Sequence, residues 1–115
     1  MHVLVVEDDA RLAEALAWIL QDNGYATEVV HDGEAGVQYG GTGTYDVSIL
    51  DVMLPKADGF TVAQRLRRAH VSTPILLLTP RDALSAKICG YDSGPDHYMT
   101  QPFPPPELLA PFRAL

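Results

Sequence analysis

The sequence has few of the features that mark secreted, membrane or nucleic-acid-binding proteins. Its 115 residues include a single cysteine, Cys89, so no disulfide can form within the chain and a reducing compartment is the natural setting. The apolar run at residues 3–6 is cut off by acidic residues and is far too short for a signal peptide or a membrane span. Positive charge is scarce: the sequence has 8 lysines and arginines but 15 aspartates and glutamates, and the net charge is −7. Nucleic acids and anionic membranes bind positively charged protein surfaces, so we expect that this chain binds neither by itself. We expect a cytoplasmic protein.

Short apolar runs alternate with helical patterns along the chain. Hydrophobic residues make up 47% of the composition and charged residues 20%, which is typical of one globular domain. We expect strands at 3–6, at 26–30, in a central run ending at Asp51, at 74–79 and at 96–100. We expect helices near 12–20, 33–40, 60–69, 83–91 and 107–115, the first of them capped by Asp9. Strands that alternate with helices predict an α/β fold, a parallel sheet covered by helices on both faces.

Acidic residues follow two of the predicted strands. Asp51 ends the central strand, and Glu7 and Asp8 come directly after the first strand. Ligands of open α/β sheets bind at the carboxyl ends of the strands, and these acids converge there if the first and third strands are neighbours. Like charges so close together repel one another, which raises pKa values. The alternative for the three acids is an ordinary solvated acidic rim.

A divalent cation would relieve that repulsion. Magnesium prefers hard oxygen ligands, and the backbone carbonyl of Met53 could add one to the three carboxylates. A carboxylate beside such an ion can attack phosphorus and form an acyl phosphate. Thr79 ends the fourth predicted strand, where its hydroxyl either donates to a phosphoryl oxygen on Asp51 or is a plain strand-end hydroxyl. Three arginines, at positions 65, 67 and 68, are expected on a solvated helix face.

Together these residues resemble the response-regulator receiver domain, most closely the OmpR/PhoB-like subfamily that is joined to a winged-helix DNA-binding domain. The resemblance rests on short motifs that span nearly the whole chain: residues 5–9, 49–55, 58–60, 78–79 and 81–82, and Tyr98 leading to residues 102–103. It implies the flavodoxin-like (βα)5 fold, a doubly wound five-stranded parallel sheet of order 2-1-3-4-5.

The resemblance also implies a role for each site residue. Asp51 is similar to the phosphoacceptor, Glu7 and Asp8 to the metal-site acids, Thr79 to the switch hydroxyl, and Tyr98 to the aromatic residue that changes rotamer on activation. For Tyr98 an ordinary half-buried aromatic remains the alternative. The implied cofactor is Mg²⁺, and the implied partner is a sensor histidine kinase that presents phosphohistidine. The implied protein is a signalling switch and not a turnover enzyme.

The chain departs from the family pattern in its last third. Gln101 stands where the family has the lysine that reaches the phosphoryl group, so one positive charge is missing. In the related subfamily, activated receivers form homodimers through the fourth helix, fifth strand and fifth helix, and Lys87 and Glu107 resemble one of the charge pairs used there. His97 and Pro111 replace a second pair, which predicts a weaker or altered dimer.

These departures leave two functions open. The first is a phosphorylation-controlled receiver, residues 1–115, whose DNA-binding output domain is expected beyond the end of this chain. The second is a degenerate receiver that acts as a phosphorylation-independent interaction or dimerisation module, because of Gln101. A flavin- or nucleotide-binding protein of the same fold is a weak third reading, since the sequence lacks a phosphate-cradling loop.

Overall fold

The computed structural model describes the backbone of residues 1–80 and 97–101, and the side chains of residues 1–78. The helices predicted at 83–91 and 107–115 lie outside the described residues, as do the predicted dimer residues Lys87 and Glu107 and the departure at Pro111. Within the described ranges, no helix is long and apolar enough to cross a membrane.

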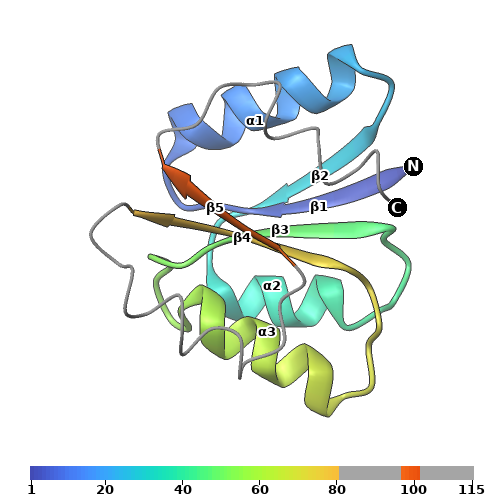
Figure 1. Cartoon of the computed structure of the whole chain (residues 1–115), viewed down its shortest axis with the longest axis vertical. Helices are drawn as coiled ribbons and strands as arrows, with labels where there is room; N and C mark the ends of the chain where they lie inside the picture. The colour runs from blue at the N-terminus through green and yellow to red at the C-terminus, as the bar shows by residue number, and fades with distance from the viewer. Residues whose placement is uncertain (81–96, 102–115) are drawn as a thin grey trace.

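Five parallel strands form one sheet, in the order β2-β1-β3-β4-β5 (Figure 1). The strands are β1 (His2–Val6), β2 (Ala26–Val30), β3 (Val47–Asp51), β4 (Ile75–Pro80) and β5 (His97–Gln101). The described helices are α1 (Ala10–Asp22), α2 (Gly33–Gly40) and α3 (Gly59–Arg68). The predicted α/β class and flavodoxin-like strand order are confirmed, although β4 and β5 each begin and end one residue later than predicted.

The sheet separates two apolar layers. Figure 1 shows α1 over one face of the sheet and α2 with α3 over the other. All five residues of β3 are buried, and successive side chains point to opposite faces. Val47 and Ile49 therefore pack in the α1 layer, and Leu50 packs in the layer of α2 and α3. Burial on both faces explains why the central run is almost uniformly apolar.

Each described helix is preceded by an aspartate that caps it, and these aspartates lie in the segments that leave the carboxyl edge of the sheet. Asp9, Asp32 and Asp58 are the N-caps of α1, α2 and α3, and each side chain accepts a hydrogen bond from a backbone N–H of the first turn. These N–H groups have no partner within the helix, so the carboxylates stabilise the helix start. The predicted cap at Asp9 is confirmed. The caps therefore fix the residue at which each helix begins after the preceding strand.

The prediction of a solvated arginine face is wrong for Arg67. Arg65 and Arg68 are exposed, but Arg67 is half-buried and its Nη1 donates to the carbonyl oxygens of Val71 at 2.6 Å and of Thr73 at 2.9 Å. The guanidinium thus ties α3 to the segment that leads into β4. Buried carbonyl groups need donors, and this need outweighs the usual preference of arginine for solvent.

Ser48 supplies a test of the core. Its hydroxyl is buried in β3, two residues before Leu50 and hence in the layer of α2 and α3, and it has no hydrogen-bond partner among the described residues. We expect Ser48→Ala to raise the free energy of unfolding by about 1 kcal/mol, because an unsatisfied buried hydroxyl is removed. Ile49→Ala, on the opposite face, should lower it by about 3 kcal/mol through the cavity it creates. Urea denaturation of both variants measures this; a loss of stability in Ser48→Ala would contradict it.

Candidate functional site

Three carboxylates gather at the carboxyl edge of the sheet, as the sequence predicts. β1 and β3 are hydrogen-bonded neighbours with Val6 opposite Leu50, so the residues that follow them reach the same point. Ligand oxygens of Glu7, Asp8 and Asp51 all lie within 4.8 Å of one another. Glu7 is only 1% exposed and Asp51 7% exposed, whereas Asp8 is exposed to solvent. Two of the three acids are therefore removed from the water that would screen their charge.

Backbone N–H groups hold two of the carboxylates in place. Oδ1 of Asp51 accepts a hydrogen bond from the N–H of Met53 at 2.9 Å, and Oε2 of Glu7 accepts one from the N–H of Asp9 at 3.3 Å. The other oxygen of Glu7, Oε1, is buried and has no hydrogen-bond donor among the described residues. A buried carboxylate oxygen without a donor is costly, and it marks a place where a cation or a proton belongs.

The ionisation of Glu7 reflects this environment. Burial of the carboxyl group, followed by the neighbouring Asp51, raises the pKa of Glu7 from 4.5 to about 8. The N–H of Asp9 acts in the opposite direction because it stabilises the charged form. Near neutral pH the metal-free site therefore keeps a proton on Glu7.

The donor set fits magnesium. All three side chains offer hard oxygen atoms, which Mg²⁺ prefers over the nitrogen and sulfur ligands typical of zinc sites. A cation would also supply the missing partner of Glu7 Oε1. Glu7, Asp8 and Asp51 are the residues that would hold the ion, with the backbone carbonyl of Met53 as a candidate further ligand. Met53 lies two residues after Asp51, in the loop that follows β3, and its N–H donates a hydrogen bond to Asp51.

The remaining predicted site residues lie on β4 and β5. Leu78 is opposite Asp51, which places the backbone of Thr79 one position further toward the same sheet edge. Gln101 is the last residue of β5 and pairs with Pro80, so its backbone also reaches that edge. Tyr98 lies three residues earlier, inside β5. The side chains of these residues lie outside the described part, so their predicted roles remain predictions.

One group near the site was not predicted from the sequence. Asp32 and Gly33 stand at the start of α2, and the structure places them against the loop at residues 52–58, which connects β3 to α3 and contains Met53. The N–H of Gly33 donates to the carbonyl oxygen of Pro55 at 3.0 Å. An Asp-Gly pair before a helix is a common turn signal, so no local pattern distinguishes this contact.

Comparison with known proteins identifies the family. The chain matches the response regulator receiver domain over residues 3–113. It is 45% identical over 113 residues to the transcriptional regulatory protein DltR of Streptococcus agalactiae, covering 98% of this chain and 50% of that protein. It is 46% identical over 115 residues to the transcriptional regulatory protein TcrA of Mycobacterium tuberculosis, covering 100% of this chain and 46% of that protein. The chain thus spans about half the length of these curated relatives.

Solved structures agree with this assignment. The receiver domain of Francisella response regulator 1452 superposes with a TM-score of 0.91 at 34% identity, covering 98% of this chain and 93% of that one. The receiver domain of the sensor histidine kinase PA1611 from Pseudomonas aeruginosa has a magnesium ion coordinated in its active-site cleft, and it superposes with a TM-score of 0.90 at 25% identity over 98% of this chain and 94% of that one. With the fold, the acidic cluster and these relatives in agreement, the chain belongs to the receiver domains of two-component response regulators, and its relatives of OmpR/PhoB type are transcriptional regulators.

Proposed function

We propose that Asp51 accepts a phosphoryl group from a phosphohistidine of a sensor histidine kinase. Oδ1 of Asp51 is held by the N–H of Met53, so we assign Oδ2 as the attacking oxygen. The new Oδ2–P bond forms as the P–N bond to the donor histidine breaks. The histidine leaves with the electron pair of that bond and takes up a proton. The product is an acyl phosphate on Asp51.

The acidic cluster is the observation that supports this proposal most directly. Three ligand oxygens lie within 4.8 Å of one another, and a buried oxygen of Glu7 lacks a donor among the described residues. When bound by Glu7, Asp8, Asp51 and the Met53 carbonyl, Mg²⁺ would neutralise negative charge on the phosphoryl oxygens. Without a cation, the acidic cluster offers an incoming phosphate no positive charge to bind, so we expect the reaction to depend on one.

The output is proposed to be transcriptional. Thr79, at the same sheet edge as Asp51, would donate its hydroxyl to a phosphoryl oxygen, and Tyr98 on β5 would change rotamer in response. The resulting surface would act on a DNA-binding domain outside these 115 residues, in keeping with the transcriptional regulators that the chain resembles. A homodimer that uses Lys87 and Glu107 belongs to the same proposal.

The alternative of a phosphorylation-independent interaction module rests on Gln101 and on the altered face of the fourth predicted helix. A glutamine can still donate a hydrogen bond to a phosphoryl oxygen, although it cannot form an ion pair. The three acids that the proposal assigns to phosphorylation lie together in one cluster. The geometry therefore favours the phosphorylated switch over the degenerate receiver.

Phosphorylation at Asp51 is tested with labelled acetyl phosphate and MgCl₂. We expect label on the wild-type chain and none on Asp51→Ala, because the attacking oxygen is missing. Asp22→Ala is the matched control: it removes an exposed aspartate at the end of α1 and should be labelled like the wild type. Equal labelling of wild type and Asp51→Ala would place the phosphoryl group elsewhere, and no label on the wild type would favour the interaction module.

Magnesium affinity should depend on pH through Glu7. Its pKa of about 8 means that metal binding near neutral pH releases a proton. Calorimetric titration with MgCl₂ should show an affinity that rises by up to about tenfold per pH unit between roughly pH 6 and 8 and then levels off. Glu7→Gln should bind Mg²⁺ more weakly and with little pH dependence over this range. A wild-type affinity that is flat across the range would contradict the assignment.

The same pKa has a consequence for the stability of the metal-free protein. The folded-state pKa of Glu7, about 8, lies above the reference value of 4.5, so folding favours the protonated form. The contribution of Glu7 to stability is complete below pH 4.5 and is lost as the pH rises through about 8. Thermal unfolding in EDTA should show this loss, and it should be absent in Glu7→Gln.

Gln101→Lys tests whether the missing charge weakens the site. A lysine would add a charge-assisted hydrogen bond to the phosphoryl oxygens in place of a neutral one, a difference of about 1 kcal/mol. We therefore expect about fivefold more phosphorylated protein at subsaturating acetyl phosphate. Gln101→Met, which keeps the length without a donor, should lie below the wild type. Equal yields for all three would show that the residue at this position does not contact the phosphoryl group.

A further inference from the structure

The loop at residues 52–58 packs against the start of α2. The carbonyl oxygen of Pro55 accepts hydrogen bonds from the N–H of Gly33 at 3.0 Å and from the N–H of Ala57 at 2.8 Å. A Cβ atom on Gly33 would lie 1.8 Å from the carbonyl oxygen of Ala57, far inside van der Waals contact. Any larger residue at position 33 would therefore have to push the loop away from α2.

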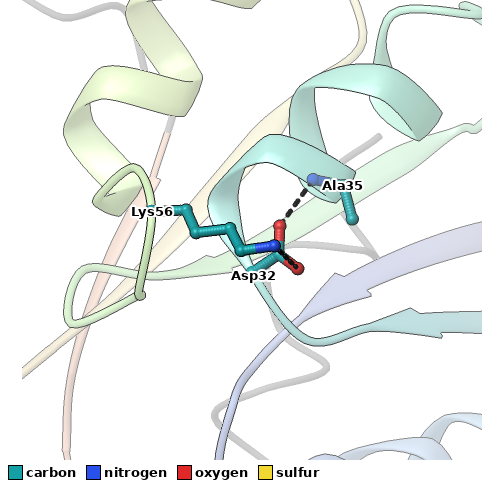
Figure 2. Close-up of polar contacts among 3 residues, drawn as sticks. All are labelled: Asp32, Ala35 and Lys56. Atoms are coloured by element: carbon teal, nitrogen blue, oxygen red, sulfur yellow. Dashed lines mark hydrogen bonds and ion pairs between the residues drawn. The ribbon is translucent and has the colours of Figure 1, made fainter.

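An ion pair joins the same two segments. Nζ of Lys56 lies 3.8 Å from Oδ2 of Asp32, while Oδ1 of Asp32 accepts the N–H of Ala35 at 2.8 Å (Figure 2). Asp32 thus caps α2 and attracts the loop with the same carboxylate. Lys56 has a φ angle of +68°, a conformation that non-glycine residues rarely adopt. The Lys56 side chain is 58% exposed, so the ion pair is screened by water and we expect it to contribute less than the Gly33 contact.

The loop connects this contact to the carboxylates. Met53 lies two residues before Pro55, and its N–H donates to Oδ1 of Asp51 at 2.9 Å. At the other end of the loop, the N–H of Gly59 donates to the carbonyl oxygen of Val52 at 3.0 Å. Between these two anchors, the Gly33 hydrogen bond and the Asp32–Lys56 ion pair both tie the loop to the start of α2. The path of the backbone at Met53 therefore depends on the start of α2.

We propose that Gly33, assisted by the Asp32–Lys56 ion pair, positions the 52–58 loop for metal binding at the acidic cluster. These three are positioning residues: they act through the loop and do not touch the cation. The inference rests on the proposed function, in which the Met53 carbonyl and Asp51 bind Mg²⁺. Residues that orient metal ligands from outside the site commonly change metal affinity by about 10–100-fold when they are altered.

Gly33→Ala against Gly40→Ala is the central experiment. Both replace a buried glycine of α2 by alanine, but the nearest atoms to a Cβ on Gly40 are side-chain methyl groups, of Leu66 at 3.3 Å and of Leu4 at 3.5 Å, and not the backbone of the loop. We expect Gly33→Ala to weaken Mg²⁺ binding, measured by calorimetric titration with MgCl₂, by about tenfold or more, and Gly40→Ala to keep wild-type affinity. Thermal unfolding of both variants reports any general loss of stability separately.

Substitutions at Lys56 keep the proposal testable if Gly33→Ala does not fold. Lys56→Gly removes the ion pair and at the same time relieves the left-handed backbone, because glycine adopts a positive φ without a steric penalty. We expect Lys56→Gly to bind Mg²⁺ about threefold more weakly, yet to unfold at no lower a temperature than the wild type. Lys56→Arg should restore the wild-type affinity. A purely structural role would instead move affinity and unfolding temperature together.

The outcomes separate this inference from the proposed function. Suppose that the wild type binds Mg²⁺ and is phosphorylated. If Gly33→Ala then binds the ion as tightly as the wild type, the positioning role is wrong and the proposed function stands. If Gly33→Ala does not fold, the same conclusion follows from wild-type affinity in Lys56→Gly. An equal loss of affinity in Gly33→Ala and Gly40→Ala would also overturn it. If the wild type itself neither binds Mg²⁺ nor accepts a phosphoryl group, the proposed function fails first.

Discussion

Repulsion among three carboxylates is the constraint on which the rest of this site depends. Glu7, Asp8 and Asp51 are brought within 4.8 Å by two neighbouring strands, and two of them are almost completely buried. Such an arrangement is unfavourable without a counter-charge, because burial removes the water that would solvate it. A proton on Glu7, whose pKa rises to about 8, reduces this cost, and the proposed divalent cation would do the same. In the proposed function, a proton and a cation would compete for this position.

The fold holds the acids in place through its backbone. The parallel order of β1 and β3 sets the two chain segments side by side, and N–H groups of Asp9 and Met53 direct the carboxylates of Glu7 and Asp51. Asp9 also caps α1, so the same turn that starts the helix orients the site. Helix caps and the three clustered acids share the carboxyl edge of the sheet, which explains why so many acidic residues accumulate there.

The loop that follows Asp51 links this edge to α2. Its carbonyl groups accept hydrogen bonds from Gly33 and Ala57, and Lys56 reaches back to the cap of α2. Because the N–H of Met53 donates to Asp51, the proposed phosphorylation of Asp51 would act on a loop that is anchored on α2. On the other side of the sheet edge, β4 and β5 bring the backbones of Thr79 and Gln101 near. The site thus lies between the loop that is anchored on α2 and the ends of β4 and β5, and a phosphoryl group could move either of them.

The sequence by itself determined the fold class, the strand order through family resemblance, and the three acids at one edge. Apolar runs broken by Asp-Gly pairs mark strands and helix starts locally, so nearby residues suffice to locate them. Only the tertiary structure decided that Arg67 binds the carbonyls of Val71 and Thr73, that Gly33 packs on the 52–58 loop, and that Glu7 is buried with a raised pKa. These properties arise from contacts between side chains and backbone groups that meet only after folding, and a local residue pattern does not encode them.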